Sequence, residues 1–426
     1  MTNLIRHTRQ EPLTQAESGW VIGLMLAAVC YQALLCALNT QGLRASAMLV
    51  GLSEGLVILA ALPLLLRRVL PGVLVLGLIA GAYFCVAALV SGQLNPKALR
   101  DLVIPLCFFW LGCNLGRPEL AERGLRMLVL VILSLGLYEL FWLDSYTRVF
   151  DIFGYYLNTG GLTPITDYER ESRLQLNGIR PEGIGRTLLP GLLGSHRVSS
   201  VFLEPVSLGN FASLIAAWGL SRDANEWRQG AWLVGASVVL LILADSRFAL
   251  VMLPLMILLR LTLRGAAWNL ALLAPFAAIV LLLLVGSLVD SKMGDTYAGR
   301  LAISGWALLD FDLYLLLGMA PPPNYGDMGY AYLLSRLGLP LCLLLWAALW
   351  LLPITDERGR RFRAFIALYV ALILTISGNS LFAFKTAALL WFLLGCLLQT
   401  PAPAARGLAI PARVPPRAIA VSTSGG

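Results

Sequence analysis

The chain of 426 residues is 58% hydrophobic and only 13% charged, and its mean hydropathy is +0.77. This composition excludes an ordinary soluble globular domain, which could not bury so much apolar surface, and it predicts an all-α polytopic membrane protein. The formal net charge of +8 lies mostly in short connections and tails, where it sets membrane topology, so it requires no nucleic-acid partner.

Twelve apolar segments are long enough to be candidate membrane-spanning helices, for which about 20 residues are typical. In chain order they are 20–38, 46–66, 71–91, 102–116, 125–143, 205–221, 231–245, 247–263, 268–288, 329–352, 363–379 and 381–398. Residues 1–19 are polar, lack a signal-peptide pattern and are expected to form a cytoplasmic tail. Residues 400–426, rich in Pro, Ala and Arg, are expected to be a disordered cytoplasmic tail, which leaves 20–399 as a single transmembrane domain.

Positive charge orients these segments. The basic residues of both tails and of alternate connections fall on one side if there are twelve spans, and the positive-inside rule makes that side cytoplasmic. We therefore expect a multi-pass protein of the bacterial inner membrane with both termini in the cytoplasm. Two long connections, 144–204 and 289–328, then lie in the periplasm, and connections of this length are usually functional or disordered.

Three pairs of glycines have the G-x-x-x-G spacing that allows membrane helices to approach closely. They are Gly51/Gly55, Gly77/Gly81 and Gly112/Gly116. We expect all three pairs to serve helix packing.

Ionisable residues inside apolar segments are costly, so they are candidate functional residues. They are Glu54, Glu139, Asp245, Arg247, Arg336 and Lys385, with Glu204 at the start of its segment. On the expected topology all of them lie in the outer half of the membrane. This distribution predicts a polar cavity open to the periplasm rather than a polar path across the whole membrane.

Several of these residues also have a purely structural interpretation. Asp245 and Arg247 fit the tip of a tight hairpin between two helices. Glu139 and Lys385 fit side chains that extend to the membrane interface, and Asp327 fits a helix N-cap. The sequence leaves both interpretations open.

The segment SHRVSSVFLEPVSLGNF, residues 195–211, places Arg197 seven residues before Glu204, at the start of an apolar helix. Glu204-Pro205 fits a helix start, because proline is tolerated in the first turn and a carboxylate is favoured by the helix dipole. Alternatively, Glu204 lies desolvated beside arginines and accepts a proton or a hydrogen bond from a sugar hydroxyl.

Four arginines are candidates for binding an anion at the outer face, because the guanidinium group suits phosphate oxygens and stays charged. They are Arg197, Arg247, Arg300 and Arg336. The anion expected at that face is the diphosphate of a lipid-linked substrate. No metal and no other cofactor is expected: the seven cysteines form no C-x-x-C pair, there are only two histidines, and no nucleotide-binding glycine motif is present.

The motifs and their order resemble the Wzy-type bacterial polysaccharide polymerases, which share a superfamily with the O-antigen ligases. The matching residues are Arg197-Val-Ser-Ser-Val-Phe-Leu-Glu204-Pro205, Asp245-Ser246-Arg247, Gly299-Arg300 with Trp306, Leu317-Gly318, and Tyr325-Gly-Asp327-Met-Gly-Tyr330. The motif-bearing resemblance covers about residues 195–345. The ligase branch carries a histidine in the second large loop, and residues 289–328 contain none, so the polymerases are the closer resemblance.

The resemblance implies a C-type glycosyltransferase-like helical fold that uses neither metal nor nucleotide sugar. Its substrates are oligosaccharides on undecaprenyl diphosphate, and a growing glycan is transferred onto a lipid-linked repeat unit. Arg197 and Arg247 match arginines expected to hold the donor diphosphate, and Glu204 and then Asp327 are the candidate bases. The candidate substrate-binding residues are Arg300, Arg336, Tyr325, Tyr330, Trp306, Glu54 and Glu139, with Tyr155 and Tyr156 as further sugar-stacking candidates.

Two other functions remain open. An O-antigen-type ligase would transfer the glycan to another acceptor, and a lipid-oligosaccharide flippase or permease would need a polar path to the cytoplasmic side. The expected partners are lipid-linked oligosaccharides and the lipid bilayer, with a chain-length regulator and a flippase as candidate protein partners.

Overall fold

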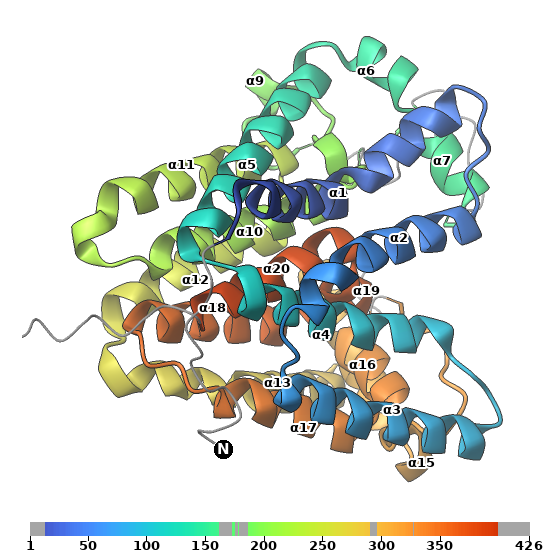
Figure 1. Cartoon of the computed structure of the whole chain (residues 1–426). Coiled ribbons are helices and arrows are strands. Elements are labelled where there is room, and N and C mark those ends of the chain that lie inside the picture. Colours follow the sequence, from blue (N-terminus) through green and yellow to red (C-terminus); the bar gives the residue numbers. More distant parts are fainter. Residues whose placement is uncertain are drawn as a thin grey trace, which may run out of the picture.

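The computed structural model describes residues 13–161, 173–174, 178, 186–289, 296–326 and 328–398. Within these ranges the chain folds into helices and forms no strand, which confirms the predicted all-α class. Most of the long helices run side by side, so that their ends gather at two opposite ends of the molecule (Figure 1). We call the end that carries Glu204 the motif end, and the opposite end, which carries Arg222 and Arg361, the basic end.

The first part of the chain forms five long helices. They are α1 (Gln15–Thr40), α2 (Ala47–Leu66), α3 (Pro71–Ser91), α4 (Pro96–Leu115) and α5 (Pro118–Phe141). Thr14 begins α1 in a capping box with Glu17, and Ser46 and Asn95 cap α2 and α4 by accepting hydrogen bonds from backbone N–H groups. Prolines occupy the first turn of α3, α4 and α5, where the missing N–H has no helical partner to lose.

The middle of the chain combines short helices with the most deeply buried long one. The elements are α6 (Leu143–Val149), α7 (Ile152–Asn158), α9 (Pro190–Leu193), η4 (Ser200–Phe202), α10 (Pro205–Ser221), η5 (Ala224–Glu226), α11 (Trp227–Ala244), α12 (Arg247–Thr262), η6 (Gly265–Leu273) and α13 (Ala274–Leu288). The described part of the predicted loop 144–204 therefore contains short helices, and its residues Val198 and Phe202 are completely buried.

The last part continues the bundle. Its helices are α14 (Tyr297–Leu309), α15 (Leu313–Leu316), α16 (Gly329–Leu337), α17 (Leu339–Leu351), α18 (Glu357–Ile373), α19 (Gly378–Phe382) and α20 (Phe384–Leu397). The predicted loop 289–328 contains a helix of 13 residues, α14, which packs on α13 with Gly286 and Gly305 in backbone contact. Residues 400–426, predicted to be a disordered tail, lie outside the described ranges.

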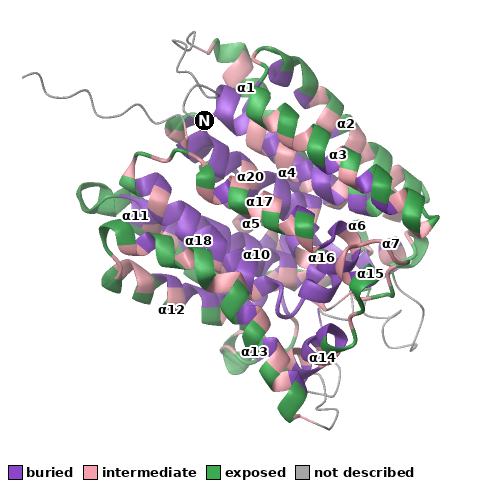
Figure 2. Cartoon of the chain, turned by 90° about the horizontal axis from the view of Figure 1, so that it is seen from below, coloured by how far each residue is buried: buried purple, intermediate pink, exposed green. Residues whose placement is uncertain are grey.

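The core of the bundle is formed by α10, α18 and α20, whereas α3 lies at the periphery (Figure 2). Nearly every residue of α10 and α20 is buried, but only Ala80, Phe84 and Ala87 of α3 are. The exposed side chains of α3 are apolar along the whole helix, including Leu78 and Leu89. Such a surface needs an apolar surrounding, which supports membrane insertion.

Within the described ranges, seven helices are long and apolar enough to cross a membrane, and an eighth span is obtained if the bent pair α16–α17 counts as one. All twelve predicted segments lie largely within helices. The segment 329–352 is nevertheless not one straight helix, as the prediction assumed, because the chain bends by 103° between α16 and α17. Gly338 at the bend has a φ of 75°, which an L-amino acid other than glycine rarely adopts, and Pro340 starts the next helix.

The predicted glycine packing is correct for one of the three pairs. Gly112 and Gly116 lie directly against α20, where a Cβ on Gly112 would come within 2.2 Å of the Phe392 carbonyl oxygen. At Gly51, Gly55 and Gly81 an added Cβ would meet nothing within 4 Å, and at Gly77 it would meet only a leucine methyl group at 3.8 Å. Close packing therefore occurs where α4 enters the core and not at the peripheral helices α2 and α3.

Candidate functional site

The motif segment 197–204 is held by hydrogen bonds along its length. The Val198 N–H donates to the Leu243 carbonyl, and the Ser200 carbonyl accepts from the Tyr146 hydroxyl at 2.8 Å. Ser200 and Leu203 have positive φ values of 52° and 59°, an unfavourable conformation for side chains of their kind. Two such residues within four positions mean that the surrounding contacts impose this backbone path on the segment, as is common at functional sites.

Glu139 is the main anchor of this segment. Its carboxylate is completely buried and accepts hydrogen bonds from the backbone N–H and hydroxyl of Ser199 and from the backbone N–H of Ser200, at 2.6–3.2 Å. The interpretation that Glu139 extends to the membrane interface is therefore wrong. Its observed contacts position the segment that leads to Glu204.

Glu204 lies at the start of α10, as the Glu204-Pro205 pair predicts, and takes part in a partly buried polar cluster. Its carboxylate accepts hydrogen bonds from the Tyr156 hydroxyl at 3.0 Å and from the Ser207 hydroxyl at 2.9 Å. The Lys385 ammonium lies 3.6 Å from the same carboxylate. We call Glu204, Lys385, Tyr156 and Ser207 the Glu204 cluster.

Lys385 is 3% exposed, so the interpretation that it extends to the membrane interface is wrong. Besides approaching Glu204, its ammonium donates to the Phe202 carbonyl at 2.6 Å and to the side-chain oxygen of Gln32 at 2.9 Å. Lys385 therefore joins the motif segment to α1 and α20. A buried ammonium is tolerated because these acceptors surround it.

A second polar group lies at the same end of the bundle and is centred on Arg100 in the first turns of α4. Arg100 contacts the Glu54 carboxylate at 3.3 Å and the Asp101 carboxylate at 2.9 Å. Glu54 also accepts from the Tyr31 hydroxyl at 2.6 Å, and Asp101 accepts from the Tyr332 hydroxyl at 2.7 Å. This group connects α1, α2, α4 and α16.

One buried hydroxyl among these groups has no partner. Tyr155 is 1% exposed, and its hydroxyl makes no hydrogen bond within the described part of the chain. The charges of both Glu54 and Glu204 act on this hydroxyl. A buried donor without a partner is costly, and it marks a place where a ligand hydroxyl or a water molecule would bind.

Arg197 and Asp245 fix the turn between α11 and α12. Asp245 ends α11 with a φ of 47° and accepts hydrogen bonds from the Thr187 hydroxyl and backbone N–H and from the Leu188 backbone N–H, at 2.8–2.9 Å. Arg197 is buried, and its Nε donates to the Ala244 carbonyl at 3.1 Å. The hairpin interpretation is thus correct for Asp245, while Arg247, in the first turn of α12, has an exposed side chain.

The candidate residues of the second large loop are dispersed. Trp306 donates from its indole to the Val289 carbonyl, and buried Tyr330 donates to the Ala371 carbonyl, so both rings serve packing between helices. Tyr325 is partly exposed and stacks on Phe311. Arg300 is half-buried in α14. Asp327, the second candidate base, lies outside the described residues.

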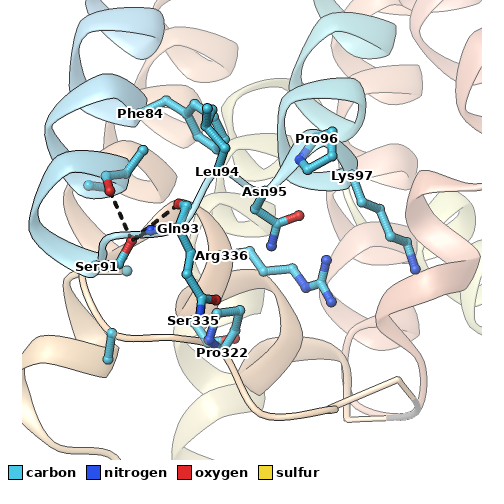
Figure 3. Close-up of a pocket in the computed structure, with 14 residues that line it drawn as sticks. Phe84, Ser91, Gln93, Leu94, Asn95, Pro96, Lys97, Pro322, Ser335 and Arg336 are labelled. Atoms are coloured by element: carbon cyan, nitrogen blue, oxygen red, sulfur yellow. Dashed lines mark hydrogen bonds between the residues drawn. The ribbon is translucent and has the colours of Figure 1, made fainter.

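Arg336 lies at a cavity of about 390 Å³ formed by the end of α3, the start of α4, α16 and residues 318–322 (Figure 3). Its polar lining residues are Ser91, Gln93, Asn95, Lys97, Ser335 and Arg336. The guanidinium of Arg336 lies over the Tyr332 ring, with 4.3 Å between its central carbon and the ring centroid, and the Lys97 ammonium lies 5.2 Å from the same centroid. Because the Tyr332 hydroxyl donates to Asp101, the cavity adjoins the Arg100 group.

The basic end holds a different set of buried charges. Arg222 pairs with Glu122 and Glu226, and Arg361 pairs with Asp223 and with Glu357. These charges were not among the ionisable residues predicted inside the apolar segments, because α5 and α18 begin earlier than predicted and carry Glu122 and Arg361 into the bundle.

Two groups in the connections at the motif end have strongly shifted pKa values. Burial, and then the charge of Glu204, raises the pKa of Tyr156 well above its usual range, so this hydroxyl remains a hydrogen-bond donor. Burial, and then the nearby charge of Arg186, lowers the pKa of His196 to about 4, so its imidazole is neutral at physiological pH. Among the described residues, no group of three or more His, Cys, Asp or Glu side chains is arranged to hold a metal ion.

Arg100, Asp101 and Lys97 were not predicted from the sequence as site residues. The predicted segment began at residue 102, whereas α4 begins at Pro96. Asn95-Pro96 was the available signal, since an Asn N-cap followed by proline is typical of a helix start. Gln32 and Tyr332 gave no signal, because they become polar partners only through contacts with distant parts of the chain.

No known protein family, no curated protein and no solved structure matches this chain. What the chain does has therefore to be argued from the arrangement of its own residues.

Proposed function

We propose that the protein is an inner-membrane polysaccharide polymerase that transfers a growing glycan from undecaprenyl diphosphate onto a lipid-linked repeat unit at the periplasmic face. The observation that carries the proposal is the Glu204 cluster with the unpartnered Tyr155 hydroxyl beside it. A carboxylate, a buried cation and phenolic hydroxyls gathered at one end of an apolar bundle suit the binding of sugar hydroxyls next to a membrane.

The proposed reaction joins two lipid-borne molecules. A hydroxyl oxygen of the acceptor sugar attacks the anomeric carbon of the donor glycan, and the bond from that carbon to the lipid diphosphate breaks. The diphosphate leaves with the bonding electron pair, and the hydroxyl proton passes to Glu204 or, after the bond has formed, to the diphosphate. Glu204 orients the attacking hydroxyl, and Arg247 and Arg197 stabilise the charge on the leaving diphosphate, an effect worth about 3 kcal/mol per donor.

The burial of Arg197 refines its expected role. Its Nε is bound to the Ala244 carbonyl, so only the remaining guanidinium N–H groups face other partners. Arg247 is three residues after Ala244 in the chain, at the start of α12, and its side chain is exposed. We therefore assign Arg247 as the principal contact to the donor diphosphate and Arg197 as the residue that positions the turn.

The proposal includes a membrane topology of twelve spans. The helices α10, α12, α18 and α20 have 14 to 17 residues and complement the seven long helices and the bent pair α16–α17. At 1.5 Å per residue they extend about 21–26 Å, which is sufficient within a bundle whose core excludes lipid. With both termini in the cytoplasm, the motif end faces the periplasm and the fold is of the C-type glycosyltransferase kind.

The contrast with a flippase rests on the middle of α10. Between Glu204 and Arg222 this helix buries large apolar side chains, including Phe211, Leu214 and Trp218, and its buried polar residues there, such as Asn210 and Ser213, are uncharged. A path for a charged headgroup would need polar groups along the way. This arrangement favours chemistry at one end of the bundle over transport through it.

The test uses the full-length protein purified in detergent and undecaprenyl-diphosphate-linked repeat units with no other acceptor. The expected result is a ladder of longer glycans on a gel. Substrate that is consumed only after lipid A or a protein acceptor is added would establish a ligase instead. No turnover under either condition, together with movement of the lipid-linked oligosaccharide between the leaflets of proteoliposomes, would establish the flippase.

A further inference from the structure

We propose that the cavity lined by Lys97 and Arg336 is a binding site for the phosphate group of a lipid whose hydrocarbon chain lies along α3. The identity of this lipid rests on the proposed polymerase activity: it is the undecaprenyl diphosphate that carries the acceptor sugar. The phosphate site itself rests on the geometry of the cavity.

The charge of the cavity wall points to an anion. Lys97 and Arg336 come from α4 and α16 and both approach the Tyr332 ring, within 5.2 Å and 4.3 Å of its centroid. No acidic side chain lines the cavity among the described residues. The Asp101 carboxylate, which acts electrostatically on Lys97, is already engaged by Arg100 and by the Tyr332 hydroxyl. Two cations held together in this way repel each other until an anion lies between them.

Donors are available for such an anion. The only contact recorded for the Arg336 guanidinium within the described ranges is with the Tyr332 ring, which leaves its five N–H donors unused. Lys97 donates to the Asn379 side-chain oxygen at 2.8 Å and has two further ammonium hydrogens. Figure 3 shows the side chains of Asn95, Lys97 and Arg336 gathered on one side of the cavity, with Phe84 and Leu94 on the other. Phosphate oxygens suit this set of donors.

The size and position of the cavity indicate a lipid headgroup. A volume of about 390 Å³ holds a diphosphate with part of a sugar, and lies within the range of about 300–1,000 Å³ typical of ligand sites. The apolar part of the wall is formed by the end of α3 and by Leu94 in the connection that follows it, and the side chains of Leu89 in α3 and of Leu94 are 83% and 78% exposed. A hydrocarbon chain that leaves the cavity would meet this apolar surface at once.

The cavity is separate from the Glu204 cluster but connected to it through side chains. Arg336 contacts the Tyr332 ring, the Tyr332 hydroxyl donates to Asp101, and Arg100 joins Asp101 to Glu54. Glu54 in turn acts electrostatically on Lys385, the partner of Glu204. A phosphate bound at Arg336 would therefore lie at the far end of the polar region that ends at Glu204, as expected for the second of two lipid-linked substrates.

The experiment uses the full-length protein in nanodiscs of zwitterionic lipid and an undecaprenyl diphosphate that carries a photoreactive group near the diphosphate. We expect crosslinks within residues 84–97 and 320–336, located by mass spectrometry of peptides. Lys97→Gln and Arg336→Gln should each weaken labelling of these peptides about tenfold. Arg44→Gln, which removes an exposed arginine of the α1–α2 connection, is the matched control and should not.

The competitors decide the source of the phosphate. Unlabelled undecaprenyl diphosphate should abolish the labelling, whereas inorganic diphosphate and phosphatidylglycerol at the same concentration should leave most of it. Equal competition by inorganic diphosphate would overturn the lipid part of the proposal, and equal competition by phosphatidylglycerol would overturn the assignment to the acceptor. If both glutamine variants, shown to be folded by size-exclusion chromatography, label like Arg44→Gln, the site is not there.

The result also separates this inference from the proposed function. Glu204→Gln should keep the labelling of the cavity while it impairs formation of the glycan ladder. Labelling without any ladder in the unsubstituted protein would retain the phosphate site and reject the polymerase.

Discussion

The two ends of the bundle both contain buried charges, but they use them differently. At the basic end, Arg222 and Arg361 each face two carboxylates, and these pairs join α5, α10 and α18. At the motif end, Lys385 has one carboxylate neighbour at 3.6 Å and two neutral acceptors, while the Tyr155 hydroxyl has no described partner. The carboxylates of the basic end neutralise Arg222 and Arg361, although the neighbouring Arg358 has guanidinium nitrogens without a hydrogen-bond partner among the described residues. At the motif end the unpartnered donor belongs instead to a cluster with a carboxylate and a buried ammonium, which is the physical basis for placing the site there.

The largest expected effect is on stability at the motif end. Lys385→Met should lower the free energy of unfolding by about 3–5 kcal/mol, because it leaves the Glu204 carboxylate without its cation and the buried Phe202 carbonyl without its donor. Thermal unfolding in detergent, followed by intrinsic fluorescence, measures this loss. Arg44→Met, in an exposed connection, is the control and should unfold like the unsubstituted protein.

The next effect concerns the reaction. Arg247→Ala should reduce the rate of glycan extension about 100-fold with little change in unfolding temperature, because its exposed side chain contributes charge rather than packing. The measurement is the initial rate of ladder formation at equal amounts of folded protein. A variant that keeps more than half of the rate would remove Arg247 from the donor site.

A smaller effect depends on pH. Because the pKa of His196 is lowered to about 4 in the folded protein, the unfolded state binds a proton first as the pH falls below about 6.5. The stability provided by the neutral imidazole is present above that pH and is lost progressively towards pH 4, by about 1–2 kcal/mol at pH 5. Unfolding temperatures measured from pH 7.5 to 5 test this, and His196→Gln should flatten that part of the profile.

The smallest effect is expected at the basic end. Arg361→Met should cost about 1–2 kcal/mol of stability, since its partners Asp223 and Glu357 are partly exposed and can be solvated when it is removed. The extension rate per folded molecule should stay unchanged. A selective loss of activity in this variant would mean that the basic end takes part in the reaction.

Hydropathy was sufficient to predict the helices, but it mislocated their ends where charges occur. The apolar runs stop at Glu122, at Arg358 and Arg361, and at Arg100-Asp101, so α5, α18 and α4 were each predicted to begin six or seven residues late. A prediction from hydropathy ends a helix where charged residues begin, and so places these residues in the connection. In the structure these charges lie inside because other side chains neutralise them, and those partners are far away in the sequence.

Only part of the candidate site could be predicted, because many of its contacts join residues that are far apart in the sequence. Glu204 and Arg197 were identified because unusual residues stand together in one short segment. The role of Glu139 as an anchor depends on Ser199 and Ser200, 60 residues later, and that of Lys385 on Phe202, 183 residues earlier. Such pairings follow from the packing of whole helices, and a local pattern does not contain them.

The bend at Gly338 has a consequence for sequence variation. A Cβ there would come within 2.5 Å of the Leu317 carbonyl oxygen and 2.6 Å of the Tyr83 hydroxyl, in addition to the strain of its positive φ. In a library of random substitutions selected for function, Gly338 should tolerate no replacement, whereas Gly51, Gly55 and Gly81 should accept alanine freely. The divergent descendants of this chain would then be recognisable by a glycine that contributes no chemistry at all.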